Sequence, residues 1–226
     1  MTAVPEGLAT IGDRISLRER VAVSLRAALV SGRMVPGTTY SIPVLADQFG
    51  VSATPVREAM LDLVSEGIMA AVPNKGFRVV ALSDTDLDEI TELRRLLEVP
   101  TVVSLAGRLD RKTIARLRRL EKEVHVAAAS GDVVAYVEAD RELHLTLLSA
   151  AGNPRLVDMV GRLRDQSRLY GLEQLAAEGV LVRSADEHRD LIDAIVSGDA
   201  ASAQAIMEHH LGHVRGLWAR GREERS

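Results

Sequence analysis

Residues 43–67 read PVLADQFGVSATPVREAMLDLVSEG, and this stretch decides the fold of the first third of the chain. Pro43 opens a short helix, because the first helical position has no intrahelical use for a backbone N–H. Gly50 ends that helix, and Pro55 lies early in a second helix whose apolar residues recur at helical spacing. The tight turn between the two, Gly50-Val51-Ser52, predicts a helix-turn-helix.

The flanking segments extend this motif to a winged helix-turn-helix. Residues 16–32 predict an amphipathic helix with Ser16 as its N-terminal cap. Residues 68–73 and 77–82 predict a two-stranded wing around the turn Asn74-Lys75-Gly76. From periodicity alone, two helices across a tight turn could equally form a plain helical corner.

The residue types at the second helix favour DNA binding over a plain corner. Ser52, Thr54 and Arg57 lie at its N-terminal end, where short polar groups and a cation can contact phosphates and a guanine edge. Lys75 and Gly76 lie at the tip of the predicted wing, where they can reach the minor groove or its phosphates. The net charge of the chain does not support DNA binding, because it is −4; the prediction depends on the arrangement of these few residues.

Composition excludes several other classes of protein. A chain of 226 residues, 46% of them hydrophobic, can bury a full core and more often forms two domains than one. No apolar run approaches the ~20 residues of a membrane span, and the first residues lack the pattern of a secretory signal, so we expect a cytoplasmic protein with no membrane partner. Because the chain has no cysteine, a metal site would need histidine, carboxylate or water.

The second half contains no strand signal and predicts six or seven helices. The expected fold is therefore mainly α, with an N-terminal winged helix-turn-helix and a C-terminal all-α helical bundle. We place a flexible N-terminal segment at residues 1–15, the DNA-binding domain at 16–82 and the helical domain at 83–222. The residues expected to face inward from the first bundle helix are Leu87, Ile90, Leu93 and Leu97. The expected helix caps are Asn153, Ser184 and Asp199.

One bundle helix carries a carboxylate and an imidazole on the same face. Asp140 and His144 are four residues apart in DRELHLTLL, among apolar residues that should bury them. His188 and His210 lie on two later helices that return antiparallel, so these two side chains can face each other. From the residues alone, both a hydrogen-bonded core pair and a site for zinc, nickel or manganese remain open.

The other three histidines are weaker candidates. His209 points away from His210 around the helix, and His213 lies one turn further along. His125 is in a charged amphipathic helix and is most simply a surface residue.

The first half resembles a known family. Residues 36–80, which include PGTTY, GVSATPVREA and LVSEG, are similar to the winged-helix domain of GntR-type transcription regulators. Ala53 stands where many members of that family have an arginine. The resemblance implies that DNA is contacted by Ser52, Thr54, Arg57, Lys75 and Gly76.

The second half is similar to the FCD domain, the ligand-binding domain of the FadR-like branch of GntR regulators. The resemblance rests on LRRLLE (93–98), DRELHLTLLSAAGNPRL (140–156) and EHRDLIDAIVSGDAASAQAIMEHH (187–210). It implies a divalent metal ion, zinc first with nickel and manganese as alternatives, held by Asp140, His144, His188 and His210.

The resemblance implies a DNA-binding transcription regulator that is not an enzyme. Its expected partners are a palindromic double-stranded DNA operator, a small carboxylic acid effector bound at or near the metal, and a second copy of the chain in a homodimer. Arg94 matches an arginine expected to bind the effector; an i,i+4 surface pair with Glu98 is the other interpretation.

Two rival functions come from other classes. A metal-dependent hydrolase or dioxygenase could use the same Asp/His cluster, and Glu187 is then the nearest candidate general base. An architectural DNA-binding protein without a ligand is the other rival, but nonspecific DNA binding depends on phosphate neutralisation and the net charge of −4 opposes it.

Overall fold

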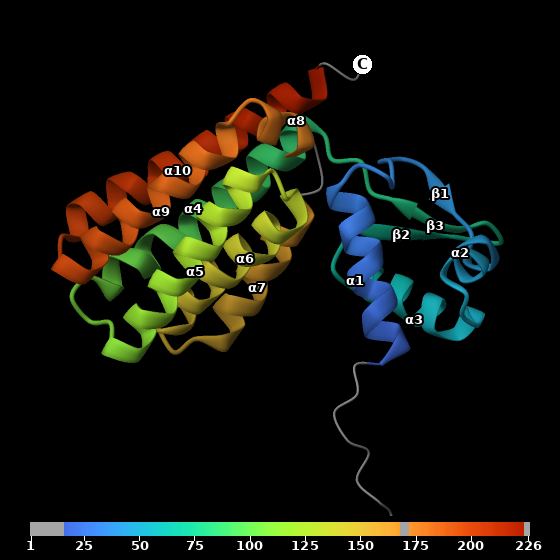
Figure 1. Cartoon of the computed structure of the whole chain (residues 1–226), viewed down its shortest axis with the longest axis horizontal. Coiled ribbons are helices and arrows are strands. Elements are labelled where there is room, and N and C mark those ends of the chain that lie inside the picture. The colour runs from blue at the N-terminus through green and yellow to red at the C-terminus, as the bar shows by residue number, and fades with distance from the viewer. Residues whose placement is uncertain (1–15, 168–171, 224–226) are drawn as a thin grey trace, which may run out of the picture.

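The structure, a computed structural model, describes residues 16–167 and 172–223 and consists of two parts (Figure 1). A small winged-helix domain lies on one side and a larger bundle of helices lies on the other. The mainly α fold predicted from the sequence is confirmed. The N-terminal segment 1–15, predicted to be flexible, lies outside the described residues.

The winged-helix domain contains three helices and a small antiparallel sheet. Its strands lie in the order β1-β3-β2, so β3 is central. The sequence predicted only the two strands of the wing, and the short additional strand β1 corrects that prediction. The elements are α1 (Leu17–Val30), β1 (Thr39–Tyr40), α2 (Ile42–Phe49), α3 (Ala53–Ser65), β2 (Met69–Val72) and β3 (Gly76–Val79).

Local chemistry explains where these elements begin and turn. Ser16 caps α1, because its hydroxyl accepts the N–H of Glu19 at 3.2 Å while the Glu19 carboxylate accepts the N–H of Ser16 at 2.7 Å. Gly50 ends α2 in the left-handed conformation, at φ +63°. A Cβ at Gly76 would lie 2.2 Å from the carbonyl oxygen of Tyr40, so the pairing of β1 with β3 requires glycine there.

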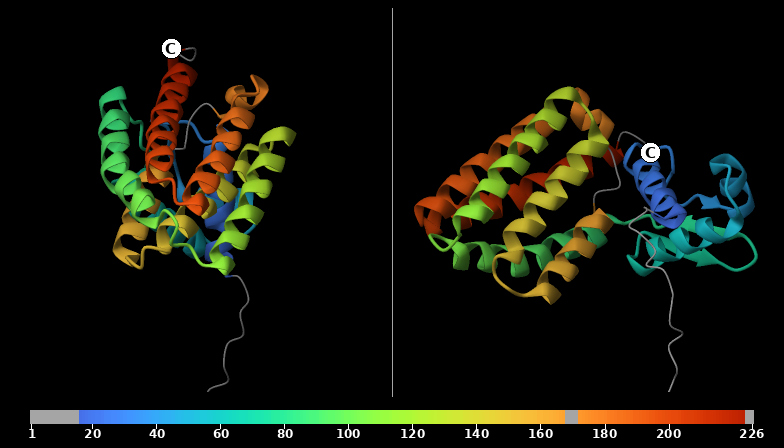
Figure 2. Two further views of the ribbon diagram at one scale, coloured as in Figure 1. Left: turned by 90° about the vertical axis from the view of Figure 1, so that its left-hand side faces the viewer. Right: turned by 60° about the horizontal axis from the view of Figure 1, so that its bottom comes forward.

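The bundle is all-helical in the part of the chain that the structure describes. Its helices pack antiparallel around a single apolar core, and Figure 2 shows them from two further sides. Six or seven helices were predicted, and seven are present among the described residues after Val79. They are α4 (Asp84–Leu105), α5 (Arg111–Ser130), α6 (Val133–Ser149), α7 (Pro154–Ser167), α8 (Leu172–Ala177), α9 (Val180–Ser197) and α10 (Ala200–Glu223).

Helix α4 is rotated relative to the sequence prediction. Leu87 and Ile90 are buried as expected and Leu97 packs partly buried against the bundle core, but Leu93 is 48% exposed. Arg94 and Glu98 take the inward positions instead. The prediction for Leu93 was wrong because the inward stripe of α4 contains charged residues, which a search for apolar periodicity assigns to the surface.

Two of the three expected caps are confirmed. Asn153 Oδ1 accepts the N–H of Leu156 at 3.2 Å, and Asp199 Oδ1 accepts the N–H of Ser202 at 3.0 Å. Ser184 is not a cap, because α9 already begins at Val180. Its buried hydroxyl instead accepts a hydrogen bond from the Tyr136 hydroxyl at 3.2 Å.

Each domain has its own core, and the two cores meet at the end of α1. The winged-helix core includes Leu25, Met60 and Leu63. Val30, at the last position of α1, belongs to the core of the bundle, and Leu82 packs against both cores. The winged-helix domain therefore packs directly against the bundle. None of the described helices combines the length and apolar character needed to cross a membrane.

Candidate functional site

Three bundle helices bring four polar side chains together in the core. Asp140 and His144 come from α6, His188 from α9 and His210 from α10, and all four are buried. Each offers one ligand atom, and these atoms lie within 4.8 Å of one another. The structure thus brings together the four residues that the sequence singled out.

The spacing of these atoms fits a common cation. The Nε2 atoms of His144 and His188 are 3.0 Å apart, and the Nε2 of His188 is 3.2 Å from Oδ1 of Asp140. Two ligands at ~2.0–2.1 Å from one ion are separated by roughly 3.0–3.4 Å. Three imidazoles and a carboxylate also suit zinc, nickel or manganese. The residues present therefore fit a divalent metal.

Two of the histidines have carboxylates on their outer nitrogens. Nδ1 of His210 lies 2.7 Å from Oε2 of Glu187, and Nδ1 of His144 lies 3.5 Å from Oε2 of Glu98. Such carboxylates orient metal-binding imidazoles and raise their basicity. This arrangement leaves the Nε2 atoms of both rings as the ones that would hold a metal ion.

A buried group of ion pairs adjoins the four residues. Arg164 of α7 donates to Oδ2 of Asp140 at 2.6 Å and to Oε2 of Glu98 at 3.1 Å. Arg94 donates through Nε to Oε1 of Glu98 at 2.6 Å. We call Arg94, Glu98, Asp140 and Arg164 the charge cluster; all four side chains are buried. Asp140 belongs both to the charge cluster and to the candidate metal site.

Burial and charge set the protonation states here. Burial, aided by the positive charge of Arg164, holds the pKa of His144 well below its usual 6.5, so this imidazole is neutral. Burial raises the pKa of Glu98, but Arg94 and Arg164 outweigh it, and the pKa is well below 4.5. Burial lowers the pKa of Arg94 to about 10, which leaves it protonated at neutral pH.

The sequence interpretation missed Arg164 and gave Glu98 only a surface role. Arg164 shares the buried side of α7 with Val160 and Ser167, at helical spacing, so a cation on an inward stripe was the available signal. The Arg94–Glu98 pair exists as one interpretation suggested, but it is buried and not on the surface.

Neither His209 nor His125 is one of the four converging residues. His209 is 72% exposed at its side chain and faces Oε1 of Glu187 at 3.5 Å. The side chain of His125 is 38% exposed, consistent with a surface position, and lies 3.5 Å from Asp186. The side chain of His213 lies outside the described residues.

The predicted DNA contacts lie on one exposed helix end and on the wing. Ser52 is the N-terminal cap of α3, and Thr54 and Arg57 are exposed on its first two turns. Lys75 is exposed in the turn between β2 and β3, and Gly76, the first residue of β3, is partly buried. The close approach of Gly76 to the backbone of Tyr40 already requires glycine at this position. The glycine is therefore explained by the fold, and its contact with DNA stays a prediction.

An exposed helix-turn-helix joined to a helical bundle with a buried polar centre is the architecture expected of a two-domain transcription regulator. Residues 17–79 match the family described as bacterial regulatory proteins, gntR family, and residues 89–213 match the FCD domain. The chain therefore belongs to the GntR family, in the branch with an FCD domain.

Known regulators resemble the chain over most of its length. It is 32% identical to the transcriptional regulator McbR of Escherichia coli over 149 residues, which is 66% of this chain and 67% of McbR. It is 27% identical to a probable D-xylose utilization operon repressor of Paenarthrobacter nicotinovorans, over 88% of this chain and 87% of that protein. The solved structure of E. coli McbR superposes with a TM-score of 0.76 at 26% identity, covering 92% of this chain and 99% of that one.

These matches decide between the function classes. The chain is a DNA-binding transcription regulator and not an enzyme. The hydrolase or dioxygenase alternative has no support from these relatives, which are regulators. Glu187, its candidate base, lies against Nδ1 of His210, where it orients that ring.

Proposed function

We propose that the chain is a cytoplasmic regulator whose operator binding is modulated by a small carboxylic acid bound at or near a metal ion. The observation that carries this proposal is the convergence of four buried donors within 4.8 Å, from Asp140, His144, His188 and His210. Zinc is the first choice, with nickel and manganese as alternatives, because the donors are imidazole and carboxylate. The ion would supply a positive charge and open positions for an anion.

Charge balance supports an anionic effector. The charge cluster pairs two arginines with two carboxylates, so its formal charges cancel. A divalent ion adds two positive charges, and Glu187 beside His210 offsets one of them. A buried net charge is costly, so a monocarboxylate that binds with the ion would restore neutrality.

Arg94 supports the same inference. Its Nε binds Glu98, but its Nη2 is buried and makes no hydrogen bond with any described residue. A buried guanidinium nitrogen without an acceptor is costly. An effector carboxylate that accepted from this nitrogen would gain a charge-assisted hydrogen bond.

The test is a thermal and DNA-binding screen with zinc and small acids. Zinc-loaded protein is mixed with a panel of mono- and dicarboxylic acids and with their uncharged amides as controls. We expect at least one acid to raise the melting temperature and change DNA affinity only when zinc is present. Equal responses in zinc-free protein, or equal responses to the amides, would contradict the proposal.

Arg57 provides a test of the DNA interface. We expect Arg57→Ala to cost about 1–3 kcal/mol in affinity for a duplex selected by the wild-type protein from random DNA, because a cation at the start of α3 contacts a base or phosphate. Fluorescence anisotropy measures the loss. The control is Arg119→Ala on α5, which removes the same charge from a side chain 67% exposed on the bundle. Equal binding by both variants would reject the assignment of Arg57.

The same proposal includes a homodimer on a palindromic operator. One face of α4 carries Leu93, Leu96, Pro100 and Val103; Leu96 is 65% exposed, and Val103 is partly buried at the edge of this stripe. Arg95 and Glu208 flank this apolar stripe, so two copies related by a twofold axis can pair opposite charges across it. A twofold dimer would present its recognition helices to half-sites about one helical turn apart.

Leu96→Glu should weaken this dimer. A charge at the centre of an apolar interface typically costs about 2 kcal/mol, which raises the dissociation constant roughly 30-fold. Analytical ultracentrifugation measures the change. Val126→Glu is the matched control, because Val126 is 67% exposed on α5 and lies outside the stripe. A monomeric wild type, or equal dimerisation of both variants, would reject this interface.

A further inference from the structure

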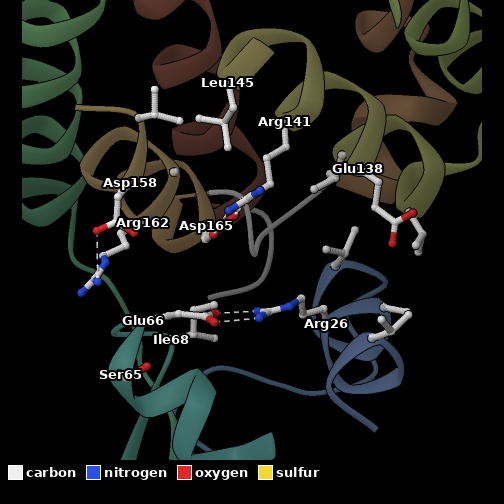
Figure 3. Close-up of a pocket in the computed structure, with 17 residues that line it drawn as sticks. Arg26, Ser65, Glu66, Ile68, Glu138, Arg141, Leu145, Asp158, Arg162 and Asp165 are labelled. Atoms are coloured by element: carbon white, nitrogen blue, oxygen red, sulfur yellow. Dashed lines mark hydrogen bonds and ion pairs between the residues drawn. The ribbon is translucent and has the colours of Figure 1, made fainter. Parts of the chain in front are cut away.

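The two domains meet across a pocket of about 570 Å³ whose walls are held by arginine–carboxylate pairs (Figure 3). On the DNA-binding side, Arg26 of α1 donates to both oxygens of Glu66, at 2.5 and 2.7 Å. On the bundle side, Arg141 of α6 donates to both oxygens of Asp165, at 2.7 and 3.0 Å. Glu66 directly follows α3, so this junction lies at the C-terminal end of the recognition helix.

One side chain crosses from the bundle to that helix end. Nε2 of Gln166 donates to the backbone carbonyl of Glu66 at 2.9 Å. Glu66 is the C-terminal cap residue of α3, whose carbonyl has no partner within the helix. Gly67 makes the approach possible, since a Cβ there would lie 2.4 Å from Nε2 of Gln166. Gln166 therefore fastens the end of the recognition helix to α7.

The residues beside Gln166 lead directly into the charge cluster. Successive helix residues point about 100° apart, so three consecutive side chains of α7 reach three different places. Arg164 binds Asp140 and Glu98 in the bundle core. Asp165 binds Arg141 at the pocket, and Gln166 binds the end of α3. A shift of this one helical turn moves all three contacts together.

We propose that Arg164, Asp165 and Gln166, which we call the coupling turn, transmit the state of the metal site to the recognition helix. The inference rests on the proposed function, because Asp140 is shared between Arg164 and the proposed ion. An ion that binds Asp140 changes the ion pair between Asp140 and Arg164. The coupling turn then moves, and the contact of Gln166 with Glu66 carries the movement to α3.

A double-mutant cycle between Asp140, which binds Arg164 at one end of the coupling turn, and Gln166 at its other end tests the proposal. The chain has no cysteine, so spin labels can be placed at V44C on α2 and V126C on α5, where the native valines are 65% and 67% exposed. Double electron–electron resonance then measures the distance between the two spin labels. Labelled chains are diluted into unlabelled ones, so that only distances within one chain are measured. The perturbations at the centre are Asp140→Asn and, separately, added zinc; the perturbation at the junction is Gln166→Ala.

We expect Asp140→Asn to shift the interdomain distance in the parent and to shift it by less than half as much in Gln166→Ala. The control is Arg162→Ala, since Arg162 lines the same pocket. It should leave the shift unchanged, because Arg162 pairs only with Asp158 of its own helix among the ion pairs described. No shift in the parent, or equal shifts with and without Gln166, overturns the proposal. Calorimetry on the same samples reports zinc binding separately, so absent binding rejects the metal site while the Asp140→Asn cycle still decides the coupling.

Discussion

Zinc should raise the melting temperature of the wild-type protein, and His144→Ala should abolish that increase. The four candidate ligands come from three helices, so an ion held by all of them stabilises the folded bundle and finds no such site in the unfolded chain. At a zinc concentration ~100 times the dissociation constant, mass action contributes about 2.7 kcal/mol. Differential scanning fluorimetry measures the shift, and a chelator should reverse it.

The chain offers a matched control for this variant. His209 is adjacent to His210 in α10, but its side chain is 72% exposed and it is not one of the four converging residues. His209→Ala should therefore bind zinc like the wild type, whereas His144→Ala should lose at least about 100-fold in affinity, because one ligand and its bond to Glu98 are both lost. A full equivalent of zinc retained by His144→Ala would return Asp140 and His144 to the role of a hydrogen-bonded core pair.

Local signals in the sequence predicted the winged helix well. Pro43, Gly50 and Pro55 act on the backbone directly, and the helices around them lie where these residues indicate. Strand β1 was missed because its two residues carry no pattern of their own. It exists because Thr39 and Tyr40 pair with Arg78 and Phe77, almost 40 residues later in the chain, and such long-range pairing leaves no local trace.

The four converging side chains could be named from the sequence, but the charge cluster could not. Asp140 and His144 share one helix face by spacing alone, and the antiparallel return of two later helices indicated His188 and His210. The resemblance then joined the four into one set of ligands. No carboxylate lies four residues before or after Arg164 in the sequence, so helical spacing gives no sign of its ion pairs. Its partners Asp140 and Glu98 lie on α6 and α4, so only the packing of three helices reveals why a cation is buried.

Arg164→Met should destabilise the zinc-free protein by about 3–5 kcal/mol, the usual cost of breaking a buried ion pair from one side. The side chain is fully buried, and its loss removes the arginine partner of Asp140 and one of the two arginine partners of Glu98. Arg162→Met, two residues earlier, removes an exposed i,i+4 pair with Asp158 and should cost about 0–1 kcal/mol. Chemical denaturation in the presence of a chelator compares the two variants.

The cause of the loss can be separated from a simple packing defect. Without Arg164, the charge cluster retains Arg94 against two carboxylates, so it holds one uncompensated negative charge. Adding Asp140→Asn removes that charge and should recover part of the lost stability, although Asp140→Asn alone should destabilise the wild type because it leaves Arg164 with one carboxylate. If the two substitutions were simply additive, the cost would come from lost packing around α7 and not from charge. Recovery in the double variant would show that Arg164 is buried in order to neutralise Asp140, the one carboxylate that the proposed metal ion also uses.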